Sequence, residues 1–98
     1  MPFIIDTFDK PNHQAVRQAH RAAHLDYLAQ NAPLLLACGA KLHDDGSDMG
    51  GGLYVVDLDT REAAQAFIDA DPFHQADLFE QVRITRWRKA YVAGTCLL

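Results

Sequence analysis

The sequence of 98 residues contains only two cysteines, no long apolar run and no excess of basic side chains. Two cysteines are too few for a disulfide scaffold, which indicates a reducing compartment such as the cytoplasm. No stretch approaches the ~20 apolar residues of a membrane span, and no basic segment followed by an apolar one indicates a secretory signal. The formal net charge of −4 argues against a general nucleic-acid binder, which needs a basic surface.

The two cysteines have different surroundings in the sequence. Cys38 lies in an apolar segment, where we expect it to pack as a small hydrophobic residue. Cys96 lies near the last residue, and we expect a free surface thiol there. No serine or cysteine occupies a nucleophile elbow, so the sequence gives no reason to propose covalent catalysis.

The overall composition is that of one globular domain spanning residues 1–98. Hydrophobic residues make up 49% of the chain and charged residues 22%, as in ordinary soluble proteins. A chain of this length builds a core but buries only part of its surface. A homodimer interface would therefore add stability, and we predict one.

Apolar periodicity and turn residues divide the chain into six main segments in the order βαββαβ. This order predicts an α+β ferredoxin-like domain, with helices packed on one face of an antiparallel sheet. The expected segments are strand 3–8, helix 13–30, strand 34–42, strand 53–58, helix 63–70 and strand 81–92.

Local signals set the expected ends of these segments. Asn12 is a candidate N-cap for the first helix, and Pro33 follows its end. The spacing of 59–62 fits a capping box before the second helix. Pro72 then predicts either a break or a short helix over 73–79. The continuous apolar start of 34–42 predicts burial on both faces of that strand.

The first helix carries three histidines, His13, His20 and His24, within a roughly 40° arc. The i,i+4 spacing of His20 and His24 can place two imidazoles on one metal ion. However, no cysteine or acidic residue completes that set, and His13 lies roughly 10 Å along the axis from His20. We therefore predict no metal site and no other cofactor, and assign His13 and His20 to a surface or an interface.

Two residues, Arg21 and Asp71, would let His24 act as a general base. Arg21 lies three residues before it, so both side chains reach one place on the helix surface. A nearby cation disfavours the charged form of a histidine and keeps it available as a neutral base. Asp71, at the break of the second helix, is the candidate acid that orients it. From spacing alone, a packing His24 and a merely capping Asp71 are the simpler interpretation.

Three further patterns have structural explanations. Asp69 and Asp71 are two residues apart and do not face each other on a helix. The glycines 50–52 lack the Gly-Lys-Ser/Thr sequence of a phosphate loop, so we expect a flexible hairpin. The basic residues around Trp87, within 83–89, fit a solvated strand face or a protected edge, and Trp87 itself would anchor a core or a dimer interface.

An ordered set of motifs resembles the YciI family of YCII-related proteins. The set begins with Arg-Ala-Ala-His-Leu-Asp-Tyr-Leu at 21–28, Gly39 and Asp-Asp-Gly at 44–46. Asp-Pro-Phe at 71–73 and Ile-Thr-Arg-Trp-Arg-Lys at 84–89 complete it. The resemblance covers nearly the whole chain. One departure is Gly51-Gly52, where many members have Gly-Ser, so that a hydroxyl is missing there.

The resemblance implies a dimeric α/β barrel of ferredoxin-like subunits, similar to muconolactone isomerase. It also implies a catalytic histidine and aspartate in a pocket, which by motif are His24 and Asp71, with Arg21 as a substrate-binding residue. One branch of the family is implicated in dehydrochlorination of a chlorinated hydroxyquinol. The leading hypothesis is a cytoplasmic enzyme for proton transfer, elimination or isomerisation of a small molecule. The alternative is a non-catalytic, dimeric ligand-binding or accessory domain.

Overall fold

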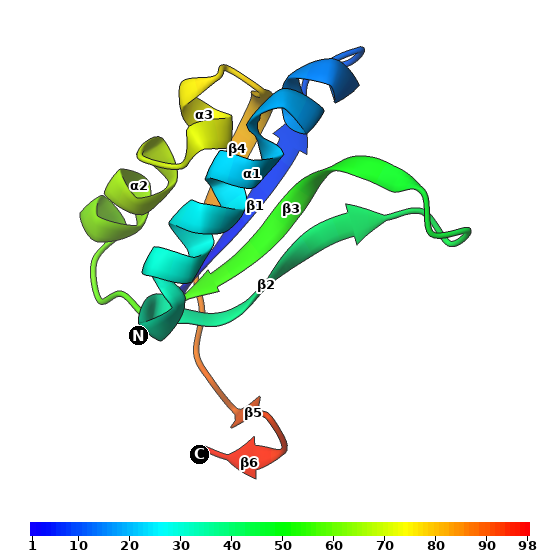
Figure 1. The fold of residues 1–98 in the computed structure, drawn as a ribbon. Helices are drawn as coiled ribbons and strands as arrows, with labels where there is room; N and C mark the ends of the chain where they lie inside the picture. Colours follow the sequence, from blue (N-terminus) through cyan, green and yellow to red (C-terminus); the bar gives the residue numbers. More distant parts are fainter.

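A computed structural model describes all 98 residues as a four-stranded antiparallel sheet with its helices on one face (Figure 1). The predicted order βαββαβ and the ferredoxin-like fold are confirmed. The elements are β1 (Phe3–Asp9), α1 (Gln14–Gln30), a 3₁₀ turn (Ala32–Leu34), β2 (Leu35–Leu42), β3 (Asp48–Val56), α2 (Arg61–Asp69), α3 (Pro72–Gln75), β4 (Phe79–Arg86), β5 (Tyr91–Val92) and β6 (Thr95–Cys96). No helix combines the length and the apolar character needed to cross a bilayer.

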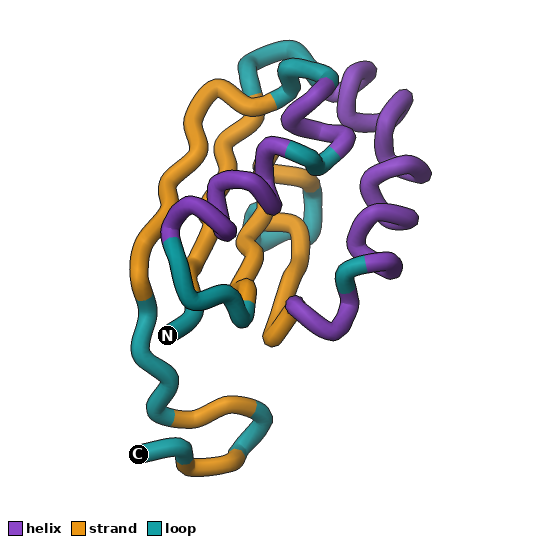
Figure 2. The backbone as a smooth tube through the Cα atoms, turned by 90° about the vertical axis from the view of Figure 1, so that its left-hand side faces the viewer, coloured by secondary structure: helices purple, strands orange, loops and turns teal.

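The sheet has the strand order β2-β3-β1-β4, so β1 and β3 lie in its centre. Ile5 of β1 is paired with Tyr54 of β3 on one side and with Ile84 of β4 on the other. Because side chains alternate along a strand, these three point to the same face of the sheet. That face is covered by the helices, and the opposite face is left uncovered in the single chain (Figure 2).

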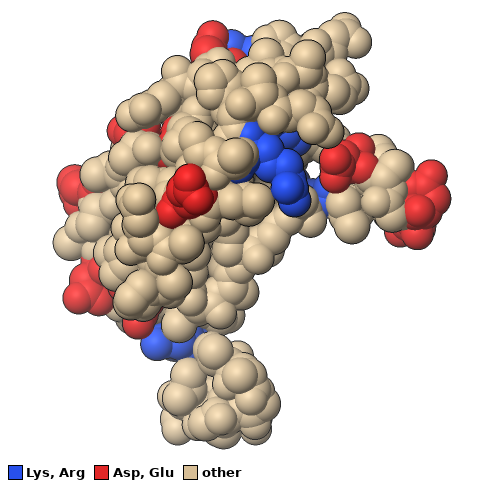
Figure 3. Space-filling view, in the orientation of Figure 1, with Lys and Arg blue, Asp and Glu red and all other residues tan.

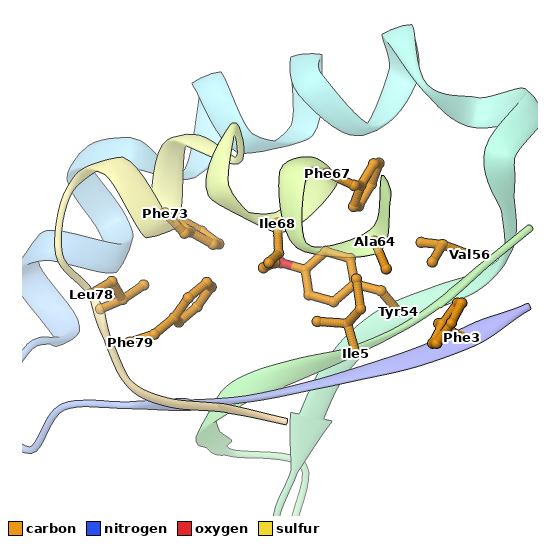
Figure 4. Packing of buried hydrophobic residues seen from close by; sticks show 10 residues of the cluster. All are labelled: Phe3, Ile5, Tyr54, Val56, Ala64, Phe67, Ile68, Phe73, Leu78 and Phe79. Atoms are coloured by element: carbon orange, nitrogen blue, oxygen red, sulfur yellow. The ribbon is translucent and has the colours of Figure 1, made fainter. Parts of the chain in front are cut away.

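The core lies between the helices and this covered face of the sheet (Figure 4). The strands contribute alternating aromatic and β-branched residues, while α2 contributes the buried stripe Ala64, Phe67 and Ile68. The segment from α3 into β4 closes the other end of the core. The buried cluster consists of Phe3, Ile5, Tyr54, Val56, Ala64, Phe67, Ile68, Phe73, Leu78 and Phe79.

The N-cap of each of the two longer helices lies one residue later in the chain than predicted. Asn12 has φ 59° and belongs to the turn before α1, while His13 occupies the cap position without a side-chain hydrogen bond. At α2 the capping residue is Thr60, whose hydroxyl accepts from the Ala63 N–H at 3.1 Å. Asp59 and Glu62 therefore do not form the predicted capping box.

The prediction that the strand after α1 is buried on both faces is wrong. β2 lies at the edge of the sheet with β3 as its only neighbour, and most of its residues are exposed. Cys38 is exposed as a residue, so it is not the buried hydrophobic residue that we expected. An apolar run does not by itself distinguish a central strand from an edge strand.

The glycines 50–52 belong to β3, so the predicted flexible hairpin is also wrong there. The turn of the hairpin lies at His43–Ser47, closed by a hydrogen bond from the His43 N–H to the Ser47 carbonyl. Gly51 has φ 136°, and a Cβ on it would lie 2.1 Å from the Thr7 carbonyl oxygen. The glycines thus let the hairpin of β2 and β3 pass close to β1 and then diverge from it (Figure 1).

A buried threonine holds this divergence in place. The Thr7 hydroxyl accepts from the Gly52 N–H at 2.9 Å and donates to the Gly52 carbonyl at 3.3 Å. Thr7 is fully buried, so both bonds are shielded from water. A hydroxyl is therefore present beside Gly52, but it comes from β1 and is used within the sheet.

The last strand is shorter at its end than predicted. β4 ends at Arg86, and the segment that follows makes a small separate hairpin from β5 and β6. This C-terminal hairpin projects away from the domain (Figure 2). Trp87 is half-buried at the base of this hairpin, where its backbone N–H donates to the Pro2 carbonyl at 2.9 Å.

Candidate functional site

Asp71 is a fully buried carboxylate at the junction between α2 and α3. Its extended backbone, with φ −65° and ψ 130°, ends one helix, and Pro72 begins the next. As the N-cap of α3, Asp71 accepts a hydrogen bond from the Phe73 N–H at 2.8 Å. A capping role explains only this one bond, and the carboxylate has further partners.

His24 is the only buried residue of α1, and its ring meets Asp71 although 47 residues separate them in the sequence. Nδ1 of His24 lies 2.9 Å from each carboxylate oxygen of Asp71. Because an ionised carboxylate only accepts hydrogen bonds, Nδ1 is the nitrogen that carries the proton in the neutral form of the ring, and Nε2 is then the basic nitrogen. The His24 side chain is 11% exposed, which leaves one edge of the ring accessible.

Tyr54 is a third partner of Asp71 that the sequence analysis did not identify. Tyr54 lies on β3, and its hydroxyl donates a hydrogen bond of 3.0 Å to the Asp71 carboxylate. Burial, and next the negative charge of Asp71, raise the pKa of Tyr54 well above its ordinary value, so the hydroxyl stays protonated. Asp71 thus accepts from an imidazole, a phenol and a backbone amide, which together fix its position.

Phe73 and Arg17 support the histidine from the other side of the site. The Phe73 ring stacks on the His24 ring, with centroids 4.0 Å apart and an interplanar angle of 16°. The Arg17 guanidinium lies 4.6 Å from the Phe73 centroid and binds Asp9 through two hydrogen bonds of 2.7 and 3.3 Å. These contacts restrict the imidazole to one orientation.

The accessible edge of His24 faces a cleft of about 220 Å³ between α1 and the strands β2 and β3, which we call the inner compartment. Its lining is largely apolar and includes Leu25, Leu28, Cys38 and Tyr54. Burial of the thiol, and next the charge of Asp71, raise the pKa of Cys38 to about 11. Cys38 is therefore a neutral thiol at physiological pH, although its strand lies at the sheet edge.

A second, polar cavity of about 340 Å³ lies beside the N-terminal half of α1, and we call it the outer compartment. Arg17, Arg21 and Ala40 line both compartments, so the two are neighbours. Arg21 is exposed and forms no ion pair. Figure 3 shows Lys and Arg side chains gathered at the hollow beside α1.

His20 of α1 and His13 at its cap are separate from the His24–Asp71 pair. His20 is exposed, as predicted, and lines neither compartment. His13 lines the outer compartment, and its Nδ1 lies 2.8 Å from the Pro11 carbonyl oxygen. No three His, Cys, Asp or Glu side chains lie close enough together to hold a metal ion.

The residues missed by the sequence analysis gave only weak local signals. Arg17 lies one helical turn before Arg21, and this spacing alone could have placed both on the cleft. Phe73 belongs to the Asp-Pro-Phe motif at 71–73, but the motif indicates no role for its ring. Tyr54 could not be identified, because its strand had no assigned inner face until the partners of β3 were known.

Comparison with known proteins agrees with this architecture over almost the whole chain. A family model for the YCII-related domain matches residues 1–88. Protein YciI of Escherichia coli is 31% identical over 98 residues, which cover 93% of this chain and 100% of that protein. Protein YciI of Shigella flexneri matches equally.

Two solved structures share the fold at different levels of identity. The 5-chloro-2-hydroxyhydroquinone dehydrochlorinase of Burkholderia phenoliruptrix AC1100, in complex with 2,5-dihydroxybenzoquinone, is 30% identical with a TM-score of 0.82. The match covers 90% of this chain and 94% of that enzyme. An antibiotic biosynthesis monooxygenase, 17% identical with a TM-score of 0.51 over 90% of this chain and 98% of that one, shares the fold alone. The chain belongs to the YCII-related (YciI) family.

Proposed function

We propose that the protein is an enzyme that moves a proton on a small ring-shaped substrate, without a cofactor, by means of His24 and Asp71. The observation that carries this proposal is the buried pair, with its one accessible edge facing a cleft. A histidine that merely packs needs no oriented carboxylate with three donors. Buried, paired titratable groups at the edge of a cleft are typical of active sites.

The roles follow from the hydrogen bonds. Asp71 holds the proton of the imidazole on Nδ1, so Nε2 is the base that faces the inner compartment. As Nε2 accepts a proton from the substrate, the imidazolium is stabilised by the adjacent carboxylate. Arg21, which has no acidic partner, would bind a negatively charged oxygen of the substrate.

A hydroxylated aromatic ring is the substrate class that the site favours. The similar dehydrochlorinase acts on a chlorinated hydroxyquinol, and the apolar lining with the stacked Phe73 suits a flat ring. In such an elimination, a substrate proton passes to His24 Nε2 and a chloride ion leaves with its bonding electrons. The substrate thereby loses HCl in total, and no oxidant is needed.

We further propose that the protein works in the cytoplasm as a homodimer. The uncovered sheet face carries the apolar residues Ile4, Phe8, Leu53 and Val55, and Leu53 is 40% exposed in the single chain. A second copy of the chain would cover this face, as in a dimeric barrel. Light scattering should give the mass of two chains at micromolar concentration, and a Leu53→Arg variant should shift it to one. A monomeric mass for the unmodified protein would refute the dimer.

The test of the proposed function is chloride release from 5-chloro-2-hydroxyhydroquinone. A positioned base contributes about 10²–10⁴-fold, so the His24→Ala variant should lose turnover by that factor. The His20→Ala variant, which removes an exposed histidine one turn away, should keep full turnover. Binding of ring compounds without turnover, unchanged by either variant, would instead identify a ligand-binding domain.

A further inference from the structure

We infer that the substrate carries a carboxylate on a short side chain, and that this group binds in the outer compartment while the ring lies beside His24. The inference deepens the proposed function and rests on it. It names a feature of the substrate that the His24–Asp71 pair alone does not indicate.

The first observation is a row of side chains along α1. His13, Arg17, Arg21, His24 and Leu28 are spaced by three or four residues, so they lie on one face of the helix. All of them line the cleft in one or the other compartment. From the C-terminal end to the N-terminal end the row changes from apolar to cationic. A ligand that lies along α1 would therefore have an apolar end at His24 and an anionic end one to two turns away, roughly 5–11 Å.

The second observation is which charges of the outer compartment are already neutralised. Arg17 is paired with Asp9, and Lys10 with Asp77 at 2.6 Å. Arg21 has no ion pair, although it lines both compartments and the whole chain carries a net charge of −4. An unpaired guanidinium offers the planar pair of donors that a carboxylate accepts.

The wall opposite α1 limits how much negative charge the bound group can carry. Asp48 of β3 also lines the outer compartment. Its charge disfavours a second anion near the strand wall, so the anion must stay on the α1 side. This arrangement favours a single carboxylate over a phosphate or a diacid.

The third observation is size. Sites for small organic ligands usually occupy about 300–1,000 Å³, and the inner compartment alone, about 220 Å³, falls below that range. The outer compartment adds about 340 Å³ beside it. A bare ring would leave the larger part of the cleft filled only with water, whereas a ring with a short acidic side chain would use both parts.

The experiment compares two ligands that differ only in charge, 2,5-dihydroxyphenylacetate and 2,5-dihydroxyphenylacetamide, with 1,4-dihydroxybenzene as the bare ring. Isothermal titration on the unmodified protein should show about tenfold tighter binding of the acid than of the amide. In the Arg21→Gln variant this ratio should fall to about one. The Arg88→Gln variant, which removes an exposed arginine outside the cleft, should keep the ratio.

A second variant leaves every residue of the inner compartment in place. Gln18 lines only the outer compartment and is exposed, so Gln18→Glu adds a negative charge there without disturbing the core. It should weaken binding of the acid about threefold or more and leave the amide unchanged.

Equal affinities for the acid and the amide in the unmodified protein would overturn the inference. A ratio that survives Arg21→Gln would overturn it too. If 1,4-dihydroxybenzene binds and the acid binds no more tightly than the amide, the carboxylate subsite is refuted and the proposed function stands. If no ring binds at all, both fail together.

Discussion

The inner and outer compartments of the cleft are built in opposite ways. In the inner compartment, each polar group of the His24–Asp71 pair is fixed by buried neighbours, including Tyr54 and Phe73. In the outer compartment, the side chains are long, largely exposed and partly paired with one another. Fixed groups suit chemistry, because their geometry is set before a substrate arrives. Long, exposed side chains suit recognition, because they have rotamers with which to fit the part of a ligand that does not react.

The largest expected effect comes from removing the negative charge of Asp71 beside the inner compartment. An Asp71→Asn variant keeps the shape of the side chain but removes the charge and one acceptor oxygen. His24 would then lose the partner that keeps its proton on Nδ1, and turnover should fall about 10²–10⁴-fold. Chloride release measured against pH checks this. Unchanged turnover in a folded Asp71→Asn variant would show that the carboxylate is only a helix cap.

The next effect concerns Gly51, at which β3 diverges from β1 and opens the cleft. A Gly51→Ala variant places Cβ against the Thr7 carbonyl and forces an L-residue to adopt φ 136°. The free energy of unfolding should fall by about 3 kcal/mol, measured by urea denaturation. Gly39→Ala is the matched control, because its Cβ would meet nothing within 4 Å. Equal losses in both variants would contradict this role of Gly51.

The reactivity of Cys38 reports on the charge of the inner compartment, which it lines, and Cys96 in the C-terminal hairpin serves as the reference thiol. The pKa of Cys38 is raised to about 11 by burial and by Asp71, whereas the pKa of Cys96 is lowered, first by a hydrogen bond from the Leu98 N–H. Since the thiolate is the reactive form, iodoacetamide at pH 8 should label Cys96 at least about tenfold faster than Cys38.

An Asp71→Asn change should narrow this difference, because removing the negative charge lowers the pKa of Cys38 and raises its thiolate fraction. Mass spectrometry of timed samples separates the two sites. Equal labelling rates in the unmodified protein would mean that the inner compartment is neither shielded nor negatively charged.

The smallest effect is expected for Tyr54, which supplies one of three donors to Asp71. A Tyr54→Phe variant should lower the free energy of unfolding by about 1–2 kcal/mol, because a buried carboxylate loses a hydrogen bond. Tyr27→Phe is the comparison, since its half-buried hydroxyl donates to a neutral carbonyl at 2.6 Å. Thermal denaturation should show the larger loss for Tyr54→Phe, and a larger loss for Tyr27→Phe would contradict it.

The part of the site that could be predicted from the sequence is the part encoded locally. His24 follows Arg21 on one helix face, and Asp71 stands before Pro72, where a helix breaks or a new short helix begins. Each of these signals depends on neighbours in the chain. Their proximity across 47 residues came from the family resemblance, since no spacing rule reaches that far.

The features that could not be predicted depend on contacts between distant strands. The glycines of β3 belong to a strand because Thr7, 45 residues earlier, binds Gly52. Tyr54 reaches Asp71 because β3 pairs with β1 in one particular register. The exposure of Cys38 follows from the position of β2 at the sheet edge. The sequence of a single strand does not specify which strands will lie beside it or which of its faces will be buried.

The most direct test of the central claim is the ¹⁵N NMR spectrum of the histidine rings, with and without 2,5-dihydroxybenzoquinone. We expect His24 at neutral pH to carry its proton on Nδ1, and its Nε2 resonance to move when the ring compound binds. His20, one turn away and exposed, should show neither the fixed tautomer nor the shift. A His24 spectrum that resembles that of His20 and does not respond to the ligand would contradict the account.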